Sequence, residues 1–261
     1  MNFDENNLFI DIPDYVKNPL GIDGTDKIQI GCAPDAIKQN GTCYSDSSIA
    51  KMKSVVPEKK YADATEVVNA VDIKFGCKTD PEWIKTVMAD FDAFLIDHAA
   101  NERKASTLAM SMVVHYPDKE DIVREMIDLA MEEMAHFREV IKIMLKRGLQ
   151  QVPDKTNFYI GSFMKAMRKD PQHYLLDRLL MFSIVEKRGA ERFGLVGEAL
   201  SKAKIKDFYQ RLAAAEYRHY ELFISLAHKY YPAEQIQSRL NELLQVEADI
   251  VKNCPLRPAV H

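Results

Sequence analysis

Four stretches of this chain have the periodicity of long amphipathic helices, and each places a glutamate in the middle of its apolar stripe. In "MEEMAHFREV", Glu133 lies on the stripe and His136 follows one helical turn later, and "AEYRHY" repeats the spacing with Glu216 and His219. A carboxylate is almost never fully buried unless it is paired or bound to a metal. The pattern therefore restricts the chain to folds that neutralise several acidic groups inside a helical core.

A single glutamate on such a stripe is more often a residue at the edge of the buried face, and a single E-x-x-H is common by chance. Four helices with the same central feature, two of them with an added histidine, make coincidence a poor explanation. The stripes are Phe91, Leu95, His98, Glu102, Ala105, Ala109 and Met112; Ile122, Met126, Leu129, Glu133, His136, Val140 and Ile143; Leu175, Leu179, Phe182, Glu186, Ala190 and Phe193; Phe208, Leu212, Glu216, His219, Phe223 and Leu226.

The central polar residues form the ligand pattern of carboxylate bundles that hold two iron or two manganese ions. Four clustered carboxylates in a core would repel one another and lose hydration, whereas two divalent cations cancel their charge. Imidazole combined with carboxylate suits iron, and manganese remains an alternative. The candidate metal-binding and catalytic residues are Glu102, Glu133, His136, Glu186, Glu216 and His219.

The connections between these helices predict an all-α, ferritin-like four-helix bundle. Short loops join the first helix to the second and the third to the fourth, while a long crossover containing "SFMKAMRK" as a short helix joins the second to the third. Asp80 or Thr79 can cap the first helix before Pro81, and Gly148 suits the position after the second. We expect helices at about 80–114, 118–147, 173–199 and 202–231, and an extra C-terminal helix at about 233–252.

Residues 1–75 differ in composition from residues 76–261, which hold the predicted bundle. The N-terminal part is rich in Gly, Pro, Asp, Asn and Ser, which favour turns. We expect an irregular extension of unassigned role, with strands around "KIQIGC" and short helices at "SSIAKMKSVV" and "ATEVVNAV".

Charge and cysteine usage indicate a cytoplasmic protein with no membrane segment. No apolar run approaches the roughly 18–20 residues needed to cross a bilayer, and "MNFDENNLFI" lacks a basic signal-peptide region. The four cysteines (Cys32, Cys43, Cys77 and Cys254) have no C-x-x-C spacing, so we expect reduced thiols. Residues 142–229 hold 17 Lys and Arg against 9 Asp and Glu, which indicates either a polyanion-binding face or solvated helix surfaces.

Other polar residues near the stripes have weaker signals. Glu191 is expected beside the site, Glu132 in solvent, and His98 either next to the ligands or as a packed core histidine. Four residues are candidates to orient ligands from outside: Asp97, Asp128, Arg192 and Arg218. The remaining histidines have no informative spacing and are expected at the surface: His115, His173, His228 and His261.

Four segments resemble the iron-dependent tRNA hydroxylases that act on 2-methylthio-N6-isopentenyladenosine. They are "GCKTDPEWI" leading into "LIDHAANERKAS", then "EEMAHFREV", "VEKRGAERF" and "AEYRHYELFISLA", in the order of that family and over about residues 75–230. All six candidate ligands are retained. The family's third motif reads nearer to I-E-A-R-S-C-E-R-F and its last to S-E-A-R-H-Y, so this chain differs at Lys187, Gly189, Ala190, Ala215 and Tyr217.

The resemblance implies an O2-dependent di-iron monooxygenase that hydroxylates the isopentenyl group of the modified adenosine beside the tRNA anticodon. Electrons would come from a ferredoxin- or reductase-type partner, and the oligomeric state stays open. Basic residues for the anticodon stem-loop would be Lys165, Arg168, Lys169, Lys202, Lys204 and Lys206. Two alternatives remain: a di-iron oxygenase or oxidase acting on a small molecule, and a non-catalytic ferritin-like iron-binding protein.

Overall fold

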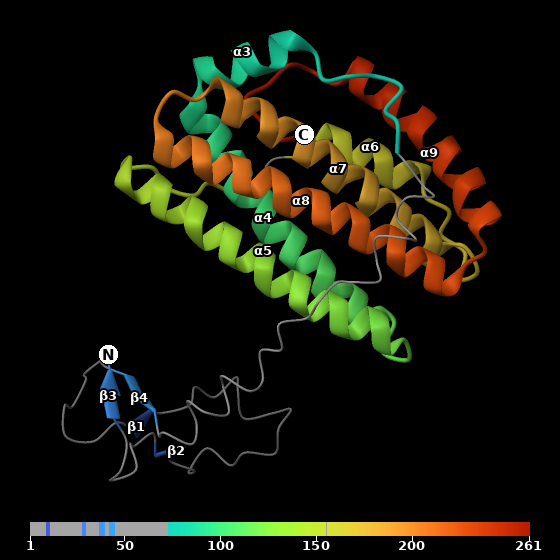
Figure 1. Ribbon diagram of the computed structural model, residues 1–261, viewed down its shortest axis with the longest axis horizontal. Helices are drawn as coiled ribbons and strands as arrows, with labels where there is room; N and C mark the ends of the chain where they lie inside the picture. The colour runs from blue at the N-terminus through green and yellow to red at the C-terminus, as the bar shows by residue number, and fades with distance from the viewer. Residues whose placement is uncertain (1–8, 11–27, 30–36, 40–41, 45–72, 155) are drawn as a thin grey trace. The chain divides into compact units, whose positions relative to one another are not determined.

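The computed structural model describes residues 73–154 and 156–261 and, before them, the backbone of four short strands (Figure 1). In the unit Met1–Tyr61, β1 (Phe9–Ile10) pairs antiparallel with β2 (Ile28–Gln29), and β3 (Ile37–Gln39) pairs antiparallel with β4 (Thr42–Tyr44). The position of β2 confirms a strand within "KIQIGC". The short helices expected at 47–56 and 64–71 lie outside the described residues, and the division of the chain into residues 1–75 and 76–261 stays a prediction.

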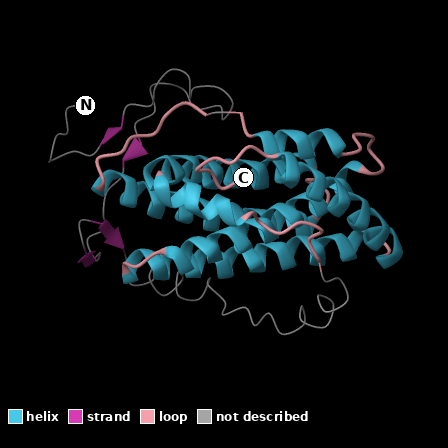
Figure 2. Ribbon diagram, turned by 90° about the horizontal axis from the view of Figure 1, so that it is seen from above, coloured by secondary structure: helices cyan, strands magenta, loops and turns pink. Residues whose placement is uncertain are grey.

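The described part of the unit Ala62–His261 is helical, and its four longest helices form the predicted bundle (Figures 1 and 2). Helix α4 (Phe91–His115) packs along α5 (Glu120–Lys146), and α7 (Tyr174–Ala199) packs along α8 (Ala203–Tyr230). Each pair is joined by a short loop. A long crossover containing α6 (Phe158–Ala166) connects the pairs, as predicted, and α9 (Ala233–Asn253) packs against α6 and α7.

The expected first helix is wrong in one respect, because the chain breaks at Asp90 into α3 (Pro81–Ala89) and α4. Asp90 has a non-helical backbone (φ −138°, ψ 69°), and its carboxylate accepts a hydrogen bond from the Ala93 N–H at 3.0 Å. It therefore ends one helix and caps the next. The break lets α3 cross the end of the bundle (Figure 1) and bury Trp83.

Local signals set the other helix ends. Asp80 caps α3 through the Glu82 N–H at 2.8 Å, with Pro81 in the first turn, as predicted. Gly148 follows α5 with a φ of +74°, a conformation that favours glycine. The crossover helix α6 begins before "SFMKAMRK", because Asn157 caps it through the Ile160 N–H at 3.0 Å, and it ends at Ala166.

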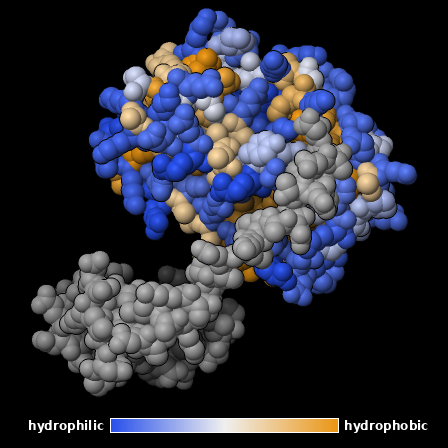
Figure 3. All heavy atoms as spheres, in the orientation of Figure 1, coloured by the Kyte–Doolittle hydropathy of each residue, from blue (hydrophilic) through white to orange (hydrophobic). Residues whose placement is uncertain are grey.

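Two apolar clusters fill the bundle, one on each side of the layer that holds the central glutamates. One contains Met112, Met126 and Leu179, and the other contains Leu95, Val140 and Leu212. No residue of the four predicted stripes is exposed. The face shown in Figure 3 is mostly hydrophilic, with apolar residues in separate patches. Among the described helices, none combines the length and the apolar character needed to cross a membrane.

Candidate metal centre

The six predicted ligand residues meet in one layer of the bundle. Glu102 comes from the middle of α4, Glu133 and His136 from α5, Glu186 from α7, and Glu216 and His219 from α8. Glu102, Glu133, Glu216 and His219 are at least 95% buried. The side chains of His136 and Glu186 retain 15% and 13% exposure, respectively.

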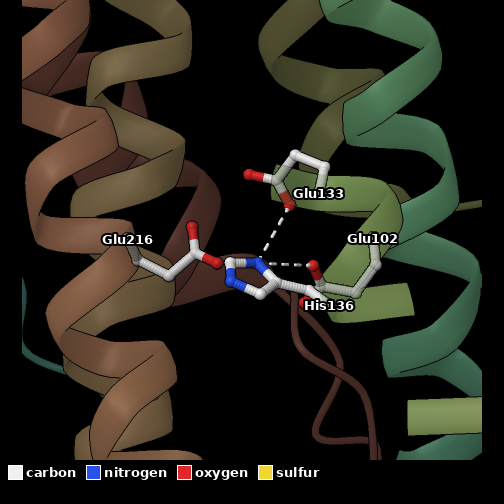
Figure 4. A group of neighbouring side chains, drawn as sticks. All are labelled: Glu102, Glu133, His136 and Glu216. Carbon is white, nitrogen blue, oxygen red and sulfur yellow. Dashed lines mark ion pairs between the residues drawn. The ribbon is translucent and has the colours of Figure 1, made fainter. Parts of the chain in front are cut away.

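The potential ligand atoms form two overlapping groups. Each group has four residues, and one ligand atom from each residue lies within 4.8 Å of a ligand atom of every other residue in its group. Figure 4 shows the first group, with His136 Nδ1 between the carboxylates of Glu102 and Glu133, at 3.5 Å and 3.6 Å. The first group is Glu102, Glu133, His136 and Glu216, and the second is Glu133, Glu186, Glu216 and His219. Because Glu133 and Glu216 occur in both groups, two adjacent cations could share them.

Unpaired polar atoms in the layer fit the chemistry of metal ligands. Glu102 Oε2, Glu133 Oε1, His136 Nδ1 and His219 Nδ1 are buried and have no well-aligned hydrogen bond in the described part of the chain. Buried polar atoms are normally hydrogen-bonded, so such a convergence requires an explanation. Divalent cations of the transition series accept both carboxylate oxygen and imidazole nitrogen. This donor set fits two such cations.

The electrostatics of the layer also favour cation binding. Burial raises the pKa of Glu102, and burial together with the charge of Glu216 raises the pKa of Glu186 well above its usual value. Burial lowers the pKa of His136, but the carboxylates of Glu102 and Glu133 outweigh it and raise this pKa to about 10. In the absence of metal, protons therefore compensate the carboxylates, and metal binding would release them.

His98 satisfies both interpretations made from the sequence. It is fully buried among aromatic side chains, and its Nε2 lies 2.6 Å from Glu102 Oε1 while its Nδ1 lies 3.1 Å from the Tyr209 hydroxyl. Burial lowers its pKa to about 3. A neutral His98 can donate one hydrogen bond to Glu102 and accept one from Tyr209, which fixes the carboxylate from behind.

Glu132 is not the solvated residue expected from the sequence. Its side chain is 39% exposed, and its carboxylate lies 3.3 Å from His219 Nε2 and 3.9 Å from His136 Nε2. Arg218 Nη2 donates to the same carboxylate at 2.8 Å, so Arg218 acts on the layer only through Glu132. The close contact with His219 lowers the pKa of Glu132 to about 2, although burial opposes the shift.

Three other residues that were expected to lie beside the ligands or to orient them instead contact groups outside the ligand layer. Glu191 contacts Thr79 at 2.8 Å and Arg188, outside both ligand groups. Asp97 and Arg192 bind the backbone of residue 260. Asp128 is exposed.

Two residues differ from what the sequence predicts, Arg168 in its contacts and His261 in its burial. Arg168 donates to the fully buried Asp177 at 2.6 Å and so forms a structural ion pair, while its binding to phosphate stays a prediction. The expectation of a surface position is wrong for His261, which is 9% exposed and stacks on Tyr159. Of the other three histidines expected at the surface, His115 is exposed, and His173 and His228 are half-buried.

A basic groove lies between the end of α5 and the start of α8. Its volume is about 390 Å³, and Lys204 from the predicted set is one of its lining residues. Lys202 and Lys204 are exposed and Lys206 is half-buried. The other basic residues of this groove are Lys142, Lys146, Arg147 and Arg211. Arg147 is paired with Asp92 and Arg211 with Glu139.

An apolar cavity of about 370 Å³ adjoins the carboxylate layer. Its lining includes the four central glutamates, and most of the remaining surface is apolar. A volume of this size is within the range of small-molecule sites. The apolar residues lining it include Leu129, Met164, Phe182, Val185, Phe193 and Phe223.

A bundle with one long crossover and a central layer of carboxylates and histidines defines a ferritin-like carboxylate protein. A sequence model of the tRNA-(MS[2]IO[6]A)-hydroxylase (MiaE) family matches residues 66–261. The chain therefore belongs to this family.

Several known proteins are similar to the chain. A tRNA 2-(methylsulfanyl)-N(6)-isopentenyladenosine(37) hydroxylase from Pseudomonas putida is 29% identical over 187 residues, covering 72% of this chain and 91% of the relative. A protein of the same name from Salmonella typhimurium is 30% identical over 155 residues, covering 59% and 56%. Among solved structures, "Protein 43 with aldehyde deformylating oxygenase activity from Synechococcus" matches with a TM-score of 0.68 and 30% identity, covering 71% and 93%.

Proposed function

We propose that the protein is a di-iron, O2-dependent monooxygenase that hydroxylates the isopentenyl group of 2-methylthio-N6-isopentenyladenosine in tRNA. The observation that carries the proposal is the layer of unpaired carboxylate and imidazole atoms beside an apolar cavity, in a chain of this family. The cavity offers the apolar surroundings that an isopentenyl group requires, and the layer offers the metal ligands that the oxidation requires.

In this proposal each ion is held by one of the two ligand groups. Glu102 and His136 would hold one ion, Glu186 and His219 would hold the other, and Glu133 and Glu216 are within reach of both positions. When bound, the two iron ions would supply O2 activation and the oxidising equivalent for a C–H bond. His98 holds Glu102, and Glu132 lies against Nε2 of both histidines, so both constrain the ligands.

The protein's own contribution is positioning and exclusion of water. Phe182, Phe193 and Phe223 form part of the cavity wall, so the reacting carbon would lie in a dry environment. The net reaction uses O2, two electrons and two protons and gives one hydroxyl group and one water. The electrons would come from a ferredoxin- or reductase-type protein. The exposed lysines at the start of α8 would bind phosphates of the anticodon stem-loop, in the cytoplasm where tRNA is modified.

The test is nucleoside analysis of the product. Iron-loaded protein, a chemical or ferredoxin reductant and O2 are incubated with an anticodon stem-loop that carries the isopentenylated base. We expect a hydroxylated nucleoside, 16 mass units heavier, from the wild type and none from Glu186→Ala. Glu198→Ala, which changes an exposed glutamate on the same helix α7, is the matched control and should retain activity. An unaltered nucleoside with the iron-loaded wild type would refute the proposal.

A second candidate is a di-iron oxygenase that acts on a small apolar molecule. The largely apolar cavity and the similarity to the Synechococcus protein favour it. Consumption of an aliphatic aldehyde by the iron-loaded protein, with no change in the stem-loop, would support this candidate. Iron binding without O2 consumption in either assay would instead support a ferritin-like iron-binding role.

A further inference from the structure

The segment after α9 returns across the bundle and contributes Val260 and His261 to the cavity wall. Side chains from three helices form hydrogen bonds with the backbone of this segment. Trp83 Nε1 of α3 donates to the Ala259 carbonyl at 3.0 Å, and Arg192 Nη1 of α7 donates to the Val260 carbonyl at 2.5 Å. The Val260 N–H donates to Asp97 Oδ2 of α4 at 2.8 Å. These bonds place the segment in one defined position rather than as a loose tail.

The His261 ring is held as firmly as the backbone before it. It stacks on Tyr159 with a centroid distance of 5.1 Å and an interplanar angle of 12°. Tyr159 is itself fully buried, and its hydroxyl donates to Glu247 Oε1 at 3.1 Å. The histidine lines the apolar cavity and also a small surface depression of about 30 Å³ that includes Arg257. It therefore forms a wall between the cavity and the outside.

One nitrogen of this buried ring has no partner. His261 is 91% buried, and its Nδ1 makes no hydrogen bond within the described part of the chain. Burial lowers the pKa of His261 to about 3, so the ring is neutral near pH 7. A neutral imidazole offers one donor and one acceptor. A residue of the cavity wall that carries an unpaired polar atom is the kind of group that fixes the orientation of a ligand.

We propose that His261 is a substrate-contacting specificity residue, whose imidazole hydrogen-bonds the nitrogen edge of the adenine base that occupies the cavity. This inference rests on the proposed function. The four glutamates of the cavity wall belong to the metal layer, so they are not available to recognise the base. Of the other polar residues that line the cavity, Asn101, Lys104 and Asn157 are already paired within the protein, and Thr156 is exposed. A purine presents both N–H donors and ring-nitrogen acceptors, and a neutral imidazole can pair with either. A purely hydrocarbon ligand would leave the nitrogen unpaired.

The experiment measures RNA binding under anaerobic conditions with metal-loaded protein. Two fluorescent stem-loops are compared: one carries 2-methylthio-N6-isopentenyladenosine, and the other is identical but abasic at that position. The proteins are the wild type, His261→Phe, His261→Gln and the control His115→Phe, whose histidine is exposed on α4. Phenylalanine preserves the stacking on Tyr159 and removes the hydrogen bond, whereas glutamine restores a donor and an acceptor.

We expect His261→Phe to weaken binding of the modified stem-loop about tenfold, the effect of losing roughly one hydrogen bond, while binding of the abasic stem-loop is unchanged. In turnover assays KM should rise with little change in kcat. His261→Gln should recover most of the affinity, and His115→Phe should match the wild type. Metal content and melting temperature verify that each variant is folded, and His261→Leu replaces the phenylalanine variant if that one does not fold.

Three results would overturn the inference. If the wild type prefers the modified stem-loop and His261→Phe retains that preference in full, His261 does not contact the base. If His261→Phe weakens both stem-loops equally, the residue acts on RNA docking or on the fold. If the wild type itself does not distinguish the two stem-loops, the proposed function fails, and this inference fails with it.

Discussion

Replacing Glu133 by alanine should remove both metal positions at once, because Glu133 belongs to both ligand groups. It is 1% exposed, and its Oε1 lies 2.9 Å from His219 Nδ1. No other carboxylate in the described part of the chain replaces it in either group. The variant should therefore bind far less than two ions per chain, whereas the wild type should bind two.

The loss of stability follows from linkage between metal binding and folding. An ion present at about 100 times its dissociation constant stabilises the folded state by about 2.7 kcal/mol. Removing both ions therefore lowers the free energy of unfolding by about 5 kcal/mol. For a domain of about 150–250 residues, 1 kcal/mol corresponds to about 2–4 °C in melting temperature. The metal-dependent rise in melting temperature, about 10–20 °C in the wild type, should disappear in Glu133→Ala.

The assay is differential scanning calorimetry with and without Fe²⁺ under anaerobic conditions, together with metal analysis. Glu139→Ala is the matched control on the same helix, because Glu139 is exposed and its ion pair with Arg211 spans 3.7 Å at the surface. Such a pair contributes less than about 1 kcal/mol. If Glu133→Ala still binds two ions per chain and retains the metal-dependent shift, the assignment of Glu133 as a shared ligand is wrong.

Two further predictions concern other charged groups of the bundle. Burial alone would raise the pKa of Asp177, but hydrogen bonds from Arg239 and Arg168 outweigh burial and lower this pKa. The stabilisation by Asp177 is therefore complete above the unfolded-state pKa and disappears as the pH falls through the folded-state pKa. The gap in unfolding free energy between wild type and Asp177→Asn should thus be largest near pH 7 and shrink below about pH 4 in urea titrations; a constant gap would contradict this. Replacing the exposed lysines at the start of α8 by alanine should weaken stem-loop binding and flatten its salt dependence by about one unit of slope for each phosphate that is no longer neutralised, with metal content unchanged. Unchanged affinity would place the RNA elsewhere. These lysines are Lys202 and Lys204.

The central layer of carboxylates and histidines could be predicted from the sequence because its signal is periodic. On a helix, residues three or four positions apart share a face, so a glutamate between apolar neighbours is placed by its register alone. Glu102 and Glu216 are buried where that register puts them. Short-range signals are equally informative: Asp80 caps α3, and Gly148 takes the left-handed conformation after α5.

The remaining features depend on contacts between residues far apart in the chain. The break at Asp90 has no unique local signal, since an aspartate also fits the surface of a continuous helix. The burial of His261 results from hydrogen bonds to Trp83, Arg192 and Asp97, which lie 68 to 176 positions from the residues they bind. The ion pair of Arg168 with Asp177 could not be predicted either, because nothing in the sequence identifies Asp177 as its partner.

The motif differences from the related hydroxylases become interpretable once they are placed in the structure. Only one of the five positions, Gly189, lines the cavity. A Cβ at Gly189 would lie 3.7 Å from the Glu216 side chain, which is an ordinary contact, so the glycine enlarges the cavity slightly without being required there.

Two other differences from the family pattern, Lys187 and Tyr217, contact each other away from the cavity. Lys187 Nζ lies 5.8 Å from the centre of the Tyr217 ring and 4.5 Å from that of Tyr220, a cation–π arrangement between α7 and α8. Lys187 and Tyr217 thus replace two alanines of the family pattern, and both contact the ring of Tyr220. Because neither residue lines the cavity, this exchange changes an outer surface of the helix pair. Among the five differences from the family pattern, Gly189 is therefore the one that can affect substrate choice from within the cavity.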